Sequence, residues 1–371
     1  MPRSPRSELI SPDETAIVMT LSVVSPGRQL AGCSSSDPSG SDDRRRMIEE
    51  CMQYQSEYFG IRPIAYSITS NSVLQMLETN PEFVQTLTDA EVAYRWLMLC
   101  PTCRKFASEL NQPSQKDIQR LCENSKQILE LRFRLSSISW WMRLMNQRIA
   151  QWFNRIDQLS SVFWAGRFRS IRIVDNTALL AGLVHIDVSA VCSNNATSLS
   201  GSEFTSIVRR FAEERAGSSS APSTMSPTRH LAPIQKNGSS AEALLASAHS
   251  TPVSENPAAE KSPVAADRRF RCSDEGVLDI TLAEYLSLVK SSCNALLGIE
   301  KMNLQAQAAA KLLQPNLTAE SWLILVRSFS KAFSHIAGEI EHIEACRTRI
   351  TRRRFYIRPL ARMLLSGCSR A

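Results

Sequence analysis

The segment from Leu131 to Asp187 constrains the fold most strongly, because its first part carries a long apolar stripe. Apolar residues recur there at alternating spacings of three and four: Ile128, Leu131, Leu135, Ile138, Met142, Met145, Ile149 and Trp152. This spacing places all of them on one side of an α-helix. We therefore expect a long helix that needs a sheet or another helix to cover it. A loop from Phe163 to Arg169 and a second helix from Leu179 to Asp187 complete the segment.

Shorter patterns on either side of this segment predict the rest of the core. β-Branched runs indicate strands, and helical spacing with capping residues indicates helices. In chain order we expect a strand at 16–24, a helix at 43–59, strands at 61–69 and 72–78, a helix from Thr88 to Leu99, the striped helix, a strand at 167–174 and a helix at 176–188. This order predicts an α+β fold, a small antiparallel sheet with helices on one face.

Composition divides the 371 residues into five parts. Residues 1–15 are polar and expected to be flexible, and 16–211 hold the α+β domain. Residues 212–275 are crowded with Ser, Ala and Pro, which predicts a disordered linker. Residues 276–346 form a helical module, docked or independent, with a capping box at Thr281 and Glu284 and a cap at Thr318. Residues 347–371 form a basic tail.

Charge and cysteine content narrow the function classes. The formal net charge is +7 and the sequence pI is about 9.0, a modest basic excess that suits a polyanionic partner. Ten cysteines are scattered without framework spacing, and the pair Cys100 and Cys103 lacks the second pair of a zinc site. The apolar run 16–24 follows Asp13 and Glu14, unlike a secretion signal. We expect a cytoplasmic protein without a membrane partner.

Two motifs in the central segment resemble a known family. Ser137 to Arg143 reads S-I-S-W-W-M-R, and Phe163 to Arg169 reads F-W-A-G-R-F-R. They resemble the single-tyrosine HUH transposases, specifically the REP-associated tyrosine transposases. The resemblance covers about 16–211 and, more loosely, 280–338. It implies a ferredoxin-like HUH core and DNA strand transfer that uses a tyrosine nucleophile and Mg²⁺ or Mn²⁺.

The residues that would carry this chemistry are replaced. The family motif S-N-H-x-H corresponds to Ser70-Asn71-Ser72-Val73-Leu74, so Ser72 and Leu74 stand at the metal-ligand positions. His185 stands at the position of the nucleophilic tyrosine, and the simpler interpretation is a partly exposed helix residue. Leucine cannot bind a metal, and neutral serine is a poor ligand for Mg²⁺. We expect no intact catalytic site and no metal cofactor, with Ser72 and Leu74 on one strand face toward the helix of His185.

Basic residues are the candidate nucleic-acid contacts. One group lies beside Trp164 and Phe168, a second follows the core, and a third lies in the tail. They are Arg155, Arg167, Arg169 and Arg172; Arg209 and Arg210; and Arg352, Arg353 and Arg354. Arginines beside aromatic rings hold phosphates and stack on bases of single strands. The alternative is that the aromatic residues are core and the arginines a solvated edge.

Together these features predict a catalytically inactive relative of these transposases that binds single-stranded or hairpin DNA. An active transposase with atypical site residues is one alternative. A protein-interaction role of the helical module is another. The oligomeric state stays open, a dimer included.

Overall fold

We describe the protein from a computed structural model. The structure describes residues 10–11, 13–30, 38–100, 112–193, 195–216, 229–236, 271–315, 317–349 and 357–365. Arg352, Arg353 and Arg354 lie outside these ranges, as do residues 217–228 and 237–270 of the predicted linker.

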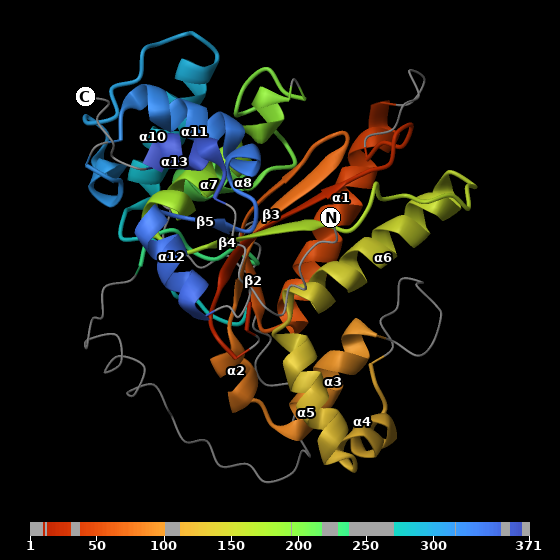
Figure 1. The fold of residues 1–371 in the computed structure, drawn as a ribbon. Helices are drawn as coiled ribbons and strands as arrows, with labels where there is room; N and C mark the ends of the chain where they lie inside the picture. The colour runs from red at the N-terminus through yellow and green to blue at the C-terminus, as the bar shows by residue number, and fades with distance from the viewer. Residues whose placement is uncertain are drawn as a thin grey trace.

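One five-stranded sheet lies at the centre of the molecule (Figure 1). Its strands are β1 (Ile17–Val23), β2 (Ile61–Ile68), β3 (Ser72–Thr79), β4 (Arg169–Ile173) and β5 (Ile336–Ala337). They are ordered β2-β3-β1-β4-β5. β1 pairs antiparallel with β3 and β4, and β2 pairs antiparallel with β3. β5 adds in parallel to β4, so the sheet is mixed. The α+β class and the four predicted strands are confirmed.

Helices cover both faces of the sheet, not one face as the sequence led us to expect (Figure 1). The alternation of side chains along each strand supplies two apolar faces. On β1, Val18 packs into the core beneath α1 (Pro38–Tyr58) and α6 (Ile138–Ile156), whereas its neighbour Met19 packs into the core beneath α7 (Asn176–Cys192). The prediction was wrong because the helix expected at 176–188, which is α7, packs on the face opposite α1 and α6, where the C-terminal helices cover it in turn.

The striped helix is two helices, α5 (Ser125–Leu135) and α6, with a break at Ser136 and Ser137. Ser137 has extended backbone angles, with φ −94° and ψ 116°. The apolar stripe continues across the break, so periodicity gave no sign of it. Serine side chains compete for backbone hydrogen bonds, which is the local reason for a break here. Ahead of α5 lie α2 (Pro81–Thr86), α3 (Asp89–Leu99) and α4 (Gln115–Cys122).

α7 lies between the sheet and the C-terminal helices. These are α10 (Leu282–Leu296), a short 3-10 helix (Ala308–Leu312), α11 (Ala319–Ala332), α12 (Ile340–Arg349) and α13 (Pro359–Leu365). One hydrophobic core contains Leu74 of β3, Leu183 of α7 and Trp322 of α11. A Cβ at Gly182 would lie 2.8 Å from Met76 Cε and 3.2 Å from Phe329, so glycine permits this three-layer packing. The predicted helical module is therefore docked and shares the core of the domain.

Parts of the predicted linker and tail also belong to the core. Residues 212–216 lie in α8 (Ser206–Ala216), and Leu231 and Ile234 are buried. Residues 229–236 lie beside Leu278, whose backbone N–H donates a hydrogen bond to Ile234 O over 2.8 Å. Likewise, Leu364 and Leu365 of α13 are buried, although they lie in the predicted tail. Composition failed here because a few apolar residues within polar sequence suffice to anchor a segment. Among the described residues, no helix has the length and apolarity that crossing a membrane requires.

Candidate functional site

Ser72 and Leu74 lie on the face of β3 that α7 covers, as predicted. Leu74 is 6 % exposed and packs in the same core as α7. The Ser72 hydroxyl lies 2.8 Å from the Thr69 hydroxyl, so it closes the turn between β2 and β3. Neither side chain faces a space in which an ion or a phosphate would fit beside ligands, because one is packed in hydrocarbon and the other is bonded within a turn.

His185 points away from this strand face. Its Nδ1 lies 2.7 Å from the Val326 carbonyl of α11, so Nδ1 carries the proton and donates it. Its ring stacks on Phe329 with 5.9 Å between centroids. Burial lowers the pKa of His185 from 6.5 to about 4, so the ring is neutral at neutral pH. The imidazole therefore holds α11 against α7.

The residue of α7 that reaches the sheet near Leu74 is Ser189. Its hydroxyl lies 2.7 Å from the Ser67 hydroxyl of β2, and Ser67 is the register partner of Leu74. Ser72, Leu74 and His185 thus do not converge on one point. These three side chains therefore do not place a metal ligand beside a nucleophile.

A buried carboxylate that sequence reasoning missed lies two residues before Ser189. Asp187 is fully buried; Ser206 Oγ donates to Oδ1 over 2.6 Å, and the Tyr285 hydroxyl donates to Oδ2. Burial raises the pKa of Asp187, while nearby Arg210 lowers it. Because Tyr285 belongs to α10 and Ser206 to α8, this carboxylate joins three segments. It is enclosed by protein, so its role is structural.

Arg209 and Arg210 are both engaged inside the molecule. Arg209 Nε and Nη2 each donate to Glu49 over 2.8 Å, a bidentate pair with a carboxylate that is itself buried. Hydrogen bonds to Glu49 raise the pKa of Arg209. Arg210 is 2 % exposed and donates to the Ile64 carbonyl over 2.5 Å. In this arrangement Arg210 cannot reach a phosphate, and its placement argues against the predicted nucleic-acid contact.

The four arginines near Trp164 fall into two groups, two bonded within the protein and two exposed. Arg169 donates to the Ser330 carbonyl over 2.8 Å, and Arg172 pairs with Glu14 over 2.6 Å. Arg155 and Arg167 are exposed. Phe168 is core, as the alternative interpretation proposed, and Trp164 is half-buried with Nε1 donating to Asn146 O over 2.9 Å.

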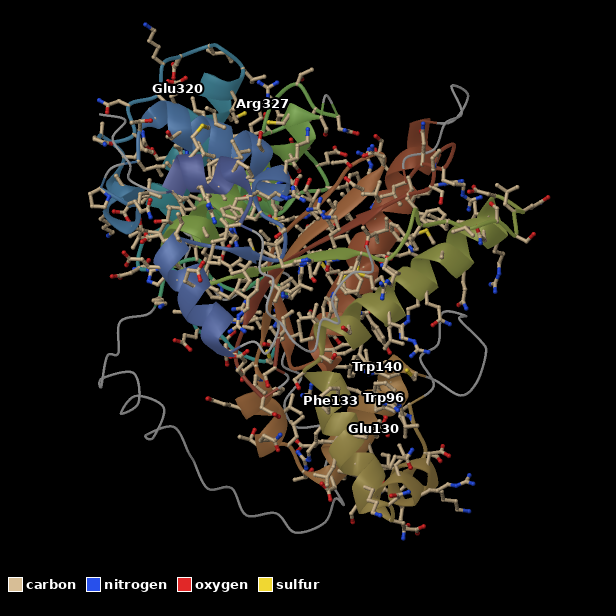
Figure 2. All side chains as sticks on the ribbon, viewed as in Figure 1. Trp96, Glu130, Phe133, Trp140, Glu320 and Arg327 are labelled. Atoms are coloured by element: carbon tan, nitrogen blue, oxygen red, sulfur yellow. The ribbon has the colours of Figure 1, made fainter. Side chains whose placement is uncertain are left out.

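A second group of aromatic and arginine side chains, which sequence reasoning did not identify, lies where α3, α5 and α6 meet (Figure 2). The rings of Trp96 and Trp140 are perpendicular with 5.4 Å between centroids. The Arg134 guanidinium lies 4.4 Å from the Trp140 ring, and that of Arg143 lies 4.7 Å from the same ring. Trp140 and Arg143 belong to the S-W-W-M-R motif, whose spacing of three residues on a helix was the available signal.

Asp175, Glu339 and His342 lie close enough together to suggest a cation site. However, Asp175 Oδ1 accepts from Ala178 N over 2.7 Å as the N-cap of α7, and Oδ2 accepts from Glu339 N over 2.6 Å. Both oxygens therefore have backbone donors that explain their position. This group ties the start of α12 to the start of α7.

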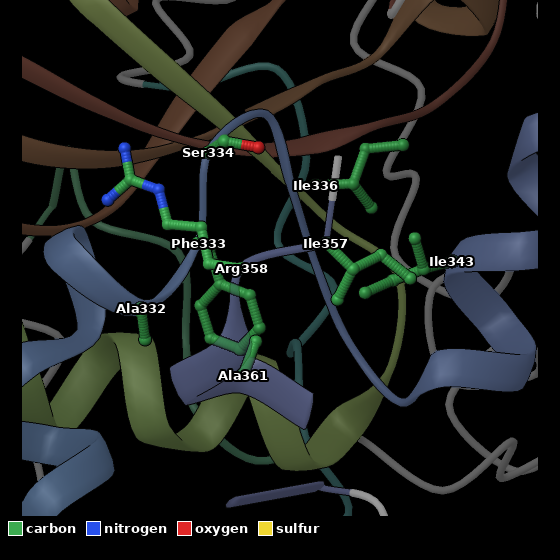
Figure 3. Close-up of a pocket in the computed structure, with 8 residues that line it drawn as sticks. All are labelled: Ala332, Phe333, Ser334, Ile336, Ile343, Ile357, Arg358 and Ala361. Carbon is green, nitrogen blue, oxygen red and sulfur yellow. The ribbon is translucent and has the colours of Figure 1, made fainter. Parts of the chain in front are cut away.

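The cavity between α11, β5 and α13 is too small for a metabolite (Figure 3). It holds about one water molecule and is lined mainly by apolar side chains, among them Phe333, Ile343 and Ile357. Arg358 lies at its edge. The cavity is a packing defect in the core between the C-terminal helices.

No protein-family model matches this chain, and no curated protein or solved structure gives a significant match to it.

Proposed function

We propose that this protein is a non-catalytic relative of the single-tyrosine HUH transposases that binds single-stranded or hairpin DNA. The order β2-β3-β1-β4, antiparallel throughout, supports a ferredoxin-like core. So does the placement of α1 and α6, the helices that link these strands, on one face. One of the two sequence motifs that resemble the family lies at the start of α6, and the other lies in the segment that leads into β4.

We infer the loss of catalysis mainly from one observation: Ser72 and Leu74 lie apart from His185. In a single-tyrosine nuclease the metal ligands and the nucleophile must reach one phosphate. Here α11 covers the ring of His185, and Leu74 is packed beneath α7. This argues against the active transposase with atypical residues, because altered chemistry would still need groups that converge.

Net charge and exposed arginines support nucleic-acid binding. The chain carries a net charge of +7, and Arg155 of α6 and Arg167, two residues before β4, are exposed. Exposed arginines near aromatic side chains suit phosphates and unstacked bases. The face over Ser72 is filled by the molecule's own helices, so a strand of DNA would bind elsewhere.

Incubation of the purified chain with labelled single-stranded and hairpin DNA tests both parts of the proposal. With Mg²⁺ or Mn²⁺ we expect no cleavage and no covalent adduct, but salt-sensitive binding in fluorescence anisotropy. The triple variant Ser72→His, Leu74→His, His185→Tyr should also be inactive, because position 185 faces α11. A covalent adduct at residue 185 in either protein would overturn the loss of catalysis. Absence of binding at low salt would overturn the DNA function.

Protein interaction is a second candidate, favoured by an exposed apolar end of α6. Trp152, Ile156, Leu159 and Val162 are between 39 % and 76 % exposed in this part of the chain. Apolar groups exposed together mark association surfaces in soluble proteins. The helices predicted to serve this role instead bury their apolar faces against α7. Light scattering of the wild type and of Val162→Asp would test self-association at this end.

A further inference from the structure

We propose that single-stranded nucleic acid binds on the surface where α3, α5 and α6 meet, which we call the tryptophan–arginine surface. It comprises Trp96, Phe133, Arg134, Trp140 and Arg143. This inference rests on the proposed DNA-binding function and goes beyond it, because it places the strand on the face opposite α7. It also replaces most of the arginines that the sequence suggested.

Positive charge gathers at this surface. Burial raises the pKa of the Cys100 thiol at the end of α3, and Arg148, Arg134 and Arg143 each lower it, so all three guanidinium groups lie near one thiol. Like charges placed together are unfavourable unless an anion joins them. Arg134 has the carboxylate of Glu130, with Nε to Oε1 at 3.1 Å. Within the described part of the chain, Arg143 is exposed and has no carboxylate partner.

Aromatic rings interleave with these charges. Arg134 lies between two rings, with its guanidinium 5.1 Å from Trp96 and 4.4 Å from Trp140. Both tryptophans are half-buried, and Phe133 is 47 % exposed on the adjoining side of α5 (Figure 2). The rings and the planar guanidinium groups supply flat faces held in fixed orientation by three helices.

This combination selects a single strand over other polyanions. Bases of a single strand stack on aromatic rings and on arginine planes, while guanidinium groups bind the phosphates between them. A duplex hides the faces of its bases, and an acidic peptide has no flat groups to stack. Arg155 lies on the same helix, twelve residues beyond Arg143 and thus about 18 Å along the axis, so a strand of several nucleotides can reach both.

The experiment compares matched variants of the full chain on oligothymidylate by fluorescence anisotropy across a salt series. Arg143→Ala should lower the slope of log affinity against log salt by about 0.7, the share of one phosphate on a single strand. Trp140→Leu, which keeps apolar bulk, should weaken binding at least about fivefold through loss of stacking. The charge-matched control is Arg327→Ala, exposed on α11 (Figure 2), and the ring control is Phe211→Leu on α8, whose side chain packs against the core that contains α7. Both controls should bind as the wild type does.

Photo-crosslinking of the wild-type protein locates the bound strand without any substitution, so it tests the proposal even if Trp140→Leu disturbs the fold. Wild-type protein irradiated with iodouracil-substituted oligonucleotide should be crosslinked in the peptides that contain Trp96, Phe133 or Trp140. Unchanged binding by both variants, or crosslinks confined to other peptides, would overturn this location and leave the DNA function standing. Stronger binding to polyglutamate than to oligothymidylate would overturn the choice of partner. Failure of the wild type to bind any oligonucleotide would overturn the proposed function itself.

Discussion

At the scale of single residues, Asp187 contributes stability through hydrogen bonds that a sequence pattern does not reveal. Its two oxygens accept from Ser206 and Tyr285 in a fully buried position. Tyr285→Phe should therefore destabilise the fold by about 1–3 kcal/mol, since one buried carboxylate oxygen loses its donor. Urea denaturation measures this. Tyr94→Phe, whose hydroxyl has no hydrogen-bond partner among the described residues, should change stability by less than about 0.5 kcal/mol.

His230 makes the stability of the fold depend on pH. It is 4 % exposed, and burial lowers its pKa from 6.5 to about 4. The unfolded chain takes up a proton near pH 6.5, and the folded chain does so only near pH 4. Stability is therefore complete above pH 6.5 and falls as pH decreases toward 4, by about 1.4 kcal/mol per unit.

The variant His230→Gln isolates this contribution. Its free energy of unfolding, measured from pH 7 downward, should fall less steeply than that of the wild type by about 1.4 kcal/mol per pH unit. The difference at neutral pH gives the cost of the substitution itself. Parallel curves for the two proteins would show that His230 does not titrate as its burial implies.

At the scale of helices and strands, local capping chemistry fixes several boundaries. Thr281 begins α10 and Thr88 begins α3, each with a capping box to the glutamate three residues on. Thr281→Ala should cost about 0.5–2 kcal/mol, because the N–H of Glu284 loses its acceptor. Thermal or urea unfolding measures the loss. Thr281→Ser keeps the acceptor and should retain most of the stability; equal losses for both variants would contradict the capping argument.

The sequence predicts elements best where the signal is local. Both predicted capping boxes are present, and the four predicted strands begin and end within about two residues of the observed strands. The break between α5 and α6 escaped because the apolar stripe runs through it. The sequence did contain evidence that α7 is buried on both sides. Its residues from Leu179 to Val191 are apolar around nearly the whole helix, and such a helix packs against other elements on both faces.

The candidate site was less predictable than the elements. Ser72 and Leu74 could be placed from strand alternation, but the direction of His185 depends on α11, more than a hundred residues further along the chain. Arginine likewise looks the same in sequence whether it is exposed, as Arg143 is, or bonded within the core, as Arg210 is. Only the packing of distant segments separates these cases.

At the scale of the whole molecule, two cores share one sheet, and the C-terminal segment completes the second. Trp322 and Phe329 of α11 pack with residues of α7 and β3, and Leu231 packs beneath α1 and α6. Removing residues 271–371 would expose the side of α7 that faces α10 and α11. Exposing an apolar face of this extent removes much of the hydrophobic stabilisation of that half of the fold.

The fragment 1–236 should therefore be insoluble or unfold without a cooperative transition when it is expressed alone. Coexpressed with residues 271–371 it should copurify as a complex, because the contacts through Asp187, His185 and the shared core need no covalent link between the pieces. The full chain should unfold in a single transition by calorimetry, with both cores lost together. If 1–236 alone unfolds as cooperatively and at the same temperature as the full chain, the C-terminal helices are an appendage, and the view of one sheet with two interdependent cores is wrong.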